Sequence, residues 1–101
     1  MSGVCGVAIL GSTGSIGRST LAVLALHPDR FRVAVLGAFS SWQVVVEQAE
    51  RFAPDLAVIV DPQAAAQARE ALRRSGSRTR VESGDEALAQ AVTAANVQVV
   101  M

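Results

Sequence analysis

Short runs of β-branched, apolar residues alternate with alanine-rich stretches along the chain. The short runs favour strands and the alanine-rich stretches favour helices. The sequence predicts strands at residues 4–10, 31–36, 56–60, 78–82 and 97–101, and helices at residues 15–26, 42–52, 62–74 and 85–95. Strands that are almost continuously apolar and alternate with helices indicate a parallel sheet covered on both faces. Right-handed crossovers then predict an α/β, Rossmann-type doubly wound fold.

Helix-capping residues support these boundaries. Ser40 and Ser83 each precede a Gln or Glu by three residues, which is capping-box spacing. Asp61 stands before a proline at the first position of a predicted helix, where an N-cap residue is expected. Pro28 and Pro54 follow two predicted helices, because the residue before proline avoids the helical region.

The length and the last residues bear on domain organisation. The 101 residues suffice for one domain, and they end at Met101 inside an apolar predicted strand. This ending predicts a sheet truncated within its last strand, although a genuine terminal strand is the alternative. We therefore expect residues 1–101 to be the N-terminal part of a larger nucleotide-binding domain. The open sheet edge predicts low stability for the isolated chain.

A glycine-rich segment, residues 11–17 (the glycine loop), is the main chemical feature of the sequence. It joins the first predicted strand to the first predicted helix, which is the setting of a dinucleotide-binding fingerprint. Gly11 permits a tight turn, Gly14 lets a pyrophosphate approach the backbone, and Gly17 lets the helix pack on the strand. The helix start offers free N–H groups, and Thr13 and Ser15 add hydroxyl donors. A glycine-rich turn without a ligand is the alternative.

Residues 37–42, after the second strand, indicate which nicotinamide cofactor would bind. An NAD site carries Asp or Glu there for the ribose 2′-hydroxyl, and no carboxylate is present. The absence favours NADP, because a carboxylate would repel the 2′-phosphate. Ser40 and Ser41 could donate to that phosphate, and Ser40 could equally be a helix N-cap. Arg18 could supply positive charge or point into solvent.

Charge and cysteine content exclude several function classes. Nine basic residues balance nine acidic residues, so no broad field for nucleic acid or membrane is expected. Cys5, the single cysteine, allows no internal disulfide and is expected to be a small buried residue. We see no secretory signal and no apolar run near membrane-spanning length, so we expect a cytoplasmic location.

The chain resembles the 1-deoxy-D-xylulose 5-phosphate reductoisomerase family over almost its whole length. The matching segments, in order, are residues 9–17, 19–21, 27–33, 47–48, 52–54, 76–79, 81 and 83–84. The glycine loop with its serine–isoleucine ending is fairly specific. There is one departure, since the family usually has a glycine, a variable and often basic residue, and an asparagine where this chain has Phe39, Ser40 and Ser41. This change bears on selectivity for NADPH.

The resemblance implies an oxidoreductase of non-mevalonate isoprenoid biosynthesis. Such an enzyme rearranges and reduces 1-deoxy-D-xylulose 5-phosphate, a phosphorylated sugar, to 2-C-methyl-D-erythritol 4-phosphate, with NADPH as hydride donor. It also implies a divalent metal, Mg²⁺ or Mn²⁺, a homodimer, and cofactor contacts from Thr13, Gly14, Ser15 and Ile16. The metal-binding and catalytic residues of the family fall beyond Met101, so this chain alone is expected to be inactive.

Two other functions remain compatible with the sequence. One is a different NADP-linked Rossmann reductase, such as a semialdehyde dehydrogenase, and the other is a nucleotide-binding module without catalysis. Other residues that might attract a functional role are better explained by structure. His27 ends a helix, Trp42 is expected to pack, and Asp85 and Glu86 complement a helix N-terminus.

Overall fold

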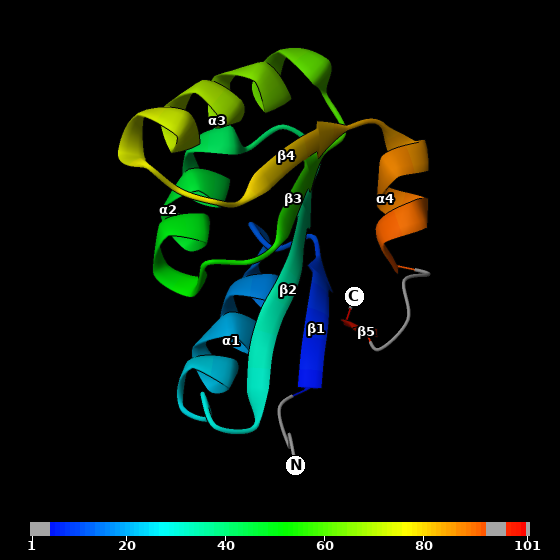
Figure 1. Ribbon diagram of the computed structural model, residues 1–101. Coiled ribbons are helices and arrows are strands. Elements are labelled where there is room, and N and C mark those ends of the chain that lie inside the picture. Colours follow the sequence, from blue (N-terminus) through cyan, green and yellow to red (C-terminus); the bar gives the residue numbers. More distant parts are fainter. Residues whose placement is uncertain (1–4, 93–96, 101) are drawn as a thin grey trace.

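The computed structural model describes residues 5–92 and 97–100, in which strands and helices alternate (Figure 1). The elements are β1 (Cys5–Leu10), α1 (Ser15–Ala25), β2 (Phe31–Ala38), α2 (Trp42–Phe52), β3 (Leu56–Ile59), α3 (Pro62–Ser75), β4 (Arg80–Ser83), α4 (Asp85–Val92) and β5 (Val97–Val100). Each predicted element is present, and α2 has its predicted bounds. The predicted positions 4, 93–95 and 101 lie outside the described residues. No helix in the described ranges is long and apolar enough to cross a membrane.

The five strands form one parallel sheet in the order β4-β3-β2-β1-β5. From β1 to β4 the chain adds each strand on the same side, and it then returns to place β5 against the other side of β1. The direction of winding therefore reverses at β1. This arrangement confirms the predicted doubly wound α/β fold, and ligands of such sheets bind at the carboxyl ends of the strands where the winding reverses.

Helices cover both faces of the sheet, and Figure 1 shows α1, α2 and α3 on one side and α4 on the other. Leu21 of α1, Val45 of α2 and Leu72 of α3 are buried in the larger core cluster, together with side chains from one face of β1, β2, β3 and β4. The smaller cluster joins the opposite face to Ala91 of α4. The alanines of α3 let that helix lie close to the strands, as Ala68 is fully buried.

Strand β2 contains a bulge that the sequence did not indicate. Val7 pairs with Val33, but the next residue, Ala8, pairs with Val35, so Ala34 is an extra residue in β2. Both Ala34 and Val35 belong to the cluster on the α4 side. The Ala34 carbonyl accepts a hydrogen bond from the Asp55 N–H at 3.0 Å, so the extra residue stays bonded to the chain entering β3.

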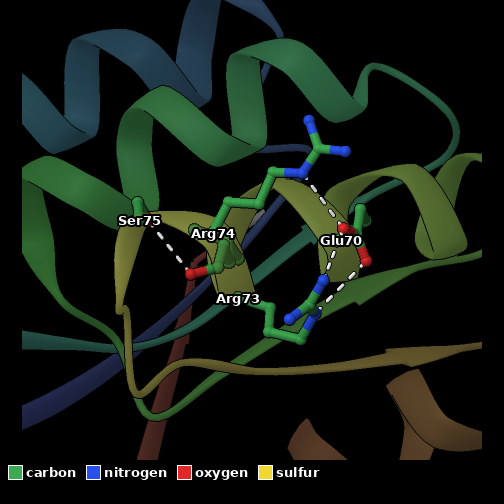
Figure 2. A network of polar contacts seen from close by, with 5 residues as sticks. Glu70, Arg73, Arg74 and Ser75 are labelled. Atoms are coloured by element: carbon green, nitrogen blue, oxygen red, sulfur yellow. Dashed lines mark hydrogen bonds and ion pairs between the residues drawn. The ribbon is translucent and has the colours of Figure 1, made fainter.

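Helix α3 has bonded caps at both ends. The Asp61 carboxylate accepts a hydrogen bond from the Ala64 N–H at 2.9 Å, as predicted, and Gly76 closes the helix in a left-handed conformation with φ 77°. On its last turns Glu70 pairs with Arg73 and Arg74 (Figure 2). These ion pairs hold the pKa of Glu70 below its ordinary value.

The two predicted capping boxes are not formed. Ser41, one residue later than expected, is the N-cap of α2, and its side chain makes no capping hydrogen bond. The Trp42 N–H instead bonds to the Ser40 carbonyl at 2.8 Å. At α4 the Leu88 N–H donates to the Gly84 carbonyl, which places a glycine rather than Ser83 at the N-cap position.

Candidate functional site

The glycine loop follows β1 at the carboxyl edge of the sheet. It lies beside the turn from β2 to α2, because β1 and β2 are neighbours. Since β5 pairs with the opposite side of β1, the loop stands where the winding reverses. A strand, a tight turn and a helix N-terminus therefore meet at the expected position for a dinucleotide's phosphates.

The three loop glycines meet different requirements. Gly11 has φ +69°, a conformation that side chains with a Cβ disfavour. A Cβ on Gly17 would lie 2.3 Å from the Gly11 carbonyl oxygen and 2.7 Å from the Ser12 Cα, so only glycine lets α1 approach the turn. Gly14 needs neither property, because its φ is −81° and a Cβ there would meet only the Gly11 oxygen, at 3.5 Å. The space beside Gly14 is therefore open.

The first turn of α1 has backbone donors and no competing acceptor. Gly14 is its N-cap and supplies no side chain, and the turn contains no acidic residue. The N–H groups of a first helical turn have no partner within the helix and carry partial positive charge. The neighbouring helix α2 also starts without a side-chain cap or an acidic residue. Two adjacent helix N-termini can thus receive negatively charged groups.

The residues predicted to contact a cofactor gather at this edge. Gly14, Ser15 and Ile16 are exposed, and Ile16 is 68% exposed despite its apolar side chain. Thr13 is half-buried in the same loop. These positions leave backbone and hydroxyl groups accessible to a ligand.

The β2–α2 turn brings its predicted residues to the same edge. Ser40 and Ser41 are exposed and leave their hydroxyls accessible, and Phe39 before them is 70% exposed. Trp42 packs against the core, as predicted. Arg18 bonds back to the loop, with its Nε donating to the Thr13 carbonyl at 2.9 Å. That bond holds Arg18 against the loop.

The sequence did not single out two residues that hold the loop in place, Ser12 within the loop and Gln48 on α2. Ser12 is fully buried, and its carbonyl accepts a hydrogen bond from Nε2 of Gln48 on α2 at 2.8 Å. Nothing in the sequence links positions 36 residues apart. The available signal was the helical spacing of Gln48, which is three residues after the buried Val45 and so lies on the buried face of α2.

The first turns of α1 and α2 contain no acidic residue. Within residues 5–92 and 97–100, no three His, Cys, Asp or Glu side chains come together as a metal site. His27 is exposed after α1, and the predicted burial of the Cys5 side chain falls outside the described side chains. The Arg32–Asp55 ion pair, at 2.9 Å, lies at the amino ends of β2 and β3. Its hydrogen bonds lower the pKa of Asp55 and raise that of Arg32.

Comparison with known proteins gives a consistent match. A family model described as 1-deoxy-D-xylulose 5-phosphate reductoisomerase matches residues 7–101. Curated proteins of that name from Burkholderia mallei and Burkholderia pseudomallei are 52% identical over 80 residues, which is 79% of this chain. The chain spans 20% of the length of these relatives.

Solved structures of the same name share the fold. A DOX-P reductoisomerase in complex with NADPH, fosmidomycin and magnesium superposes with a TM-score of 0.86 and 36% identity, covering 92% of this chain and 22% of that one. The enzyme from Zymomonas mobilis in complex with NADPH gives 0.83 and 37%, covering 91% and 24%. The similarity thus extends through both the sequence and the arrangement of the elements.

Proposed function

Because the chain belongs to the 1-deoxy-D-xylulose 5-phosphate reductoisomerase family, we propose that it is the NADPH-binding part of an enzyme with that activity. The parent would rearrange and reduce 1-deoxy-D-xylulose 5-phosphate to 2-C-methyl-D-erythritol 4-phosphate in non-mevalonate isoprenoid biosynthesis. NADPH supplies the hydride for the reduction. Membership of this family disfavours a semialdehyde dehydrogenase.

The observation that carries the proposal is the uncapped first turn of α1 after the glycine loop. Its unpaired N–H groups and the open space beside Gly14 suit a pyrophosphate, and the fit of Gly17 sets the helix close behind it. We assign the phosphate contacts to backbone and side chains of Gly11, Thr13, Gly14, Ser15 and Ile16. These residues bind and orient the cofactor and take no part in proton transfer.

Ser40 and Ser41 are proposed to receive the ribose 2′-phosphate. Their hydroxyls are exposed at the start of α2, where the first turn has no carboxylate to repel a phosphate. Hydroxyls and backbone N–H groups carry no full positive charge, so we expect weaker selectivity for NADPH over NADH than a basic residue would give.

We place the remaining parts of the parent's function outside this chain. The relatives are about four times as long as this chain, and the described residues contain no ligand cluster for Mg²⁺ or Mn²⁺. The metal, the sugar phosphate site and a homodimer contact are therefore proposed for the rest of the parent enzyme. The chain alone should bind cofactor without turnover.

The chain's own fluorescence tests the binding proposal. Trp42 is the single tryptophan, there is no tyrosine, and it begins α2 beside Ser41. Titration with NADPH should quench Trp42 and produce energy transfer to the bound nicotinamide. NADH serves as the comparison ligand and should bind more weakly. Unchanged emission at millimolar NADPH would contradict the proposal.

A further inference from the structure

Ser12 connects the glycine loop to two other elements. Its N–H donates to the Gly37 carbonyl of β2 at 2.9 Å, and its carbonyl accepts from Gln48 of α2 at 2.8 Å. The side chain is completely buried. Both backbone groups of one loop residue are therefore held from outside the loop, one by a strand and one by a helix side chain.

The bond to Gln48 determines the orientation of a peptide group. The Ser12 carbonyl and the Thr13 N–H belong to the same planar trans peptide, so they point in opposite directions. A carbonyl held toward α2 leaves the Thr13 N–H directed away from α2. If this peptide turned over, a carbonyl oxygen would replace a donor in the loop, and it would repel a pyrophosphate.

We propose that Gln48 is a positioning residue for the dinucleotide, because its amide keeps the Ser12–Thr13 peptide with its N–H toward the phosphates. The inference rests on the proposed function for its ligand, although the orientation of the peptide can be measured without one. Gln48 reaches the loop from α2, the helix that starts at the proposed 2′-phosphate position. This bond therefore links the glycine loop to that helix.

Two buried polar atoms lie in the residues that form this contact. In the described part of the chain, the Ser12 hydroxyl oxygen and Oε1 of Gln48 are the buried side-chain polar atoms that lack a hydrogen-bond partner. Unpaired buried polar groups destabilise a fold, and native proteins contain few of them. Both atoms belong to the two residues that share the loop contact.

Replacing Gln48 with glutamate, an acid of nearly the same shape, separates a positioning role from a purely structural one. Only the positioning role predicts that cofactor affinity depends on the protonation of the new side chain. In Gln48→Glu an ionised carboxylate faces the Ser12 carbonyl and cannot donate, whereas a protonated carboxyl can. We expect NADP⁺ affinity, measured by quenching of Trp42, to fall about tenfold at neutral pH. Acidification should restore it, because burial raises the pKa of such a carboxyl. NADP⁺ is chosen because NADPH decomposes in acid.

The wild-type chain and Gln67→Glu, an exposed change of the same charge on α3, provide the reference at each pH. The ratio of the NADP⁺ affinities of these two proteins should stay the same on acidification, whereas the affinity of Gln48→Glu should rise relative to both. Gln48→Leu should bind weakly at every pH. If Gln48→Leu does not fold, the NADP⁺ affinities of Gln48→Glu at neutral and at acidic pH still test the proposal, because both are measured on one folded protein. Equal affinity of wild type and Gln48→Glu at neutral pH would overturn the proposal.

Amide hydrogen exchange without cofactor separates this inference from the proposed function. Gln48→Glu at neutral pH should exchange faster at residues 12–17 than the wild type, while the Gln67→Glu control stays unchanged there. Faster exchange in a chain that never binds NADP⁺ would support the positioning of the loop and reject the cofactor. Unchanged exchange in the loop would reject the role of Gln48, whatever the wild-type chain binds.

Discussion

Helices α1 and α3 begin at the same edge of the sheet, but their first turns differ. At α3 the Asp61 carboxylate accepts a hydrogen bond from the Ala64 N–H, and a proline follows at the first helical position. At α1 the N-cap is Gly14, which has no side chain to accept, and the first turn carries no acid. The chain therefore satisfies one helix start internally and leaves the other available.

This difference separates stability from binding within one repeated unit. Each βα unit of the sheet places a helix N-terminus at the carboxyl edge, so position alone does not make a phosphate site. A self-capped start, such as that of α3, has its donors and its positive potential already occupied by a carboxylate. An uncapped start loses that stabilisation and retains the ability to bind an anion. Substitutions should therefore move stability and affinity separately at the two helices.

The largest effect is expected from Gly17→Ala, which would force α1 away from the turn. The new Cβ would overlap two backbone atoms that cannot rotate aside, the Gly11 oxygen and the Ser12 Cα. We expect the free energy of unfolding to fall by about 3 kcal/mol or more. Urea denaturation followed by circular dichroism measures this loss. Gly14→Ala, whose Cβ fits, is the matched control and should change stability by less than about 1 kcal/mol.

Gly14→Asp should give α1 the kind of start that α3 has. The aspartate can accept from the first-turn N–H groups, which raises stability by about 0.5 kcal/mol, and its charge occupies the proposed phosphate position. We expect NADPH affinity to fall at least about tenfold, as a charged competitor replaces an open site. Gly14→Asn caps without charge and should weaken binding less. A Gly14→Asp chain that binds NADPH normally would refute the assignment of this turn.

Asp61→Ala reverses the experiment at α3. Loss of the N-cap hydrogen bond should lower the free energy of unfolding by about 1 kcal/mol, while NADPH affinity stays unchanged. Thermal denaturation and the Trp42 titration report the two quantities on the same sample. Asp61→Asn retains an acceptor and should recover most of the stability. A loss of affinity in a folded Asp61→Ala chain would show that the two helix starts are coupled.

The smallest effect is expected at the opposite edge of the sheet, where Arg32 and Asp55 form an exposed pair. Asp55→Asn should cost less than about 1 kcal/mol, because solvent screens the pair. The bond to Arg32 lowers the pKa of Asp55 from its ordinary 3.8, so the contribution is complete above that value. It should disappear as the pH falls through the lower, folded pKa. Urea midpoints of wild type and variant should converge in strong acid.

The parts of the fold that were predicted correctly are those determined by residues close together in the sequence. The bounds of α2 were predicted correctly, and Asp61 caps α3 as its sequence indicates. Strand β4 begins at Arg80 rather than at residue 78, since Thr79 is buried and its hydroxyl bonds to the Pro54 carbonyl at 2.7 Å. That bond joins distant segments, so no local pattern could have indicated it.

In the candidate site, too, the features set by local sequence were predicted and those set by tertiary contacts were not. The three glycines were identified from their spacing after a strand, because backbone conformation and close packing leave a mark on the local sequence. The contact of Gln48 with Ser12 and the bulge at Ala34 arise only when strands and helices are brought together. The capping box at Ser40 failed because α2 begins one residue after Ser41, which moves the expected spacing by one position.

The pairing of β1 with β5 also has a consequence during synthesis. Residues 6–9 of β1 are synthesised before their partners in β5, residues 97–100. At roughly 5–20 residues per second, the ribosome leaves this flank of β1 bare for several seconds. A nascent chain therefore carries β1 with one side exposed to other strands in that interval, and such an unpaired edge favours aggregation.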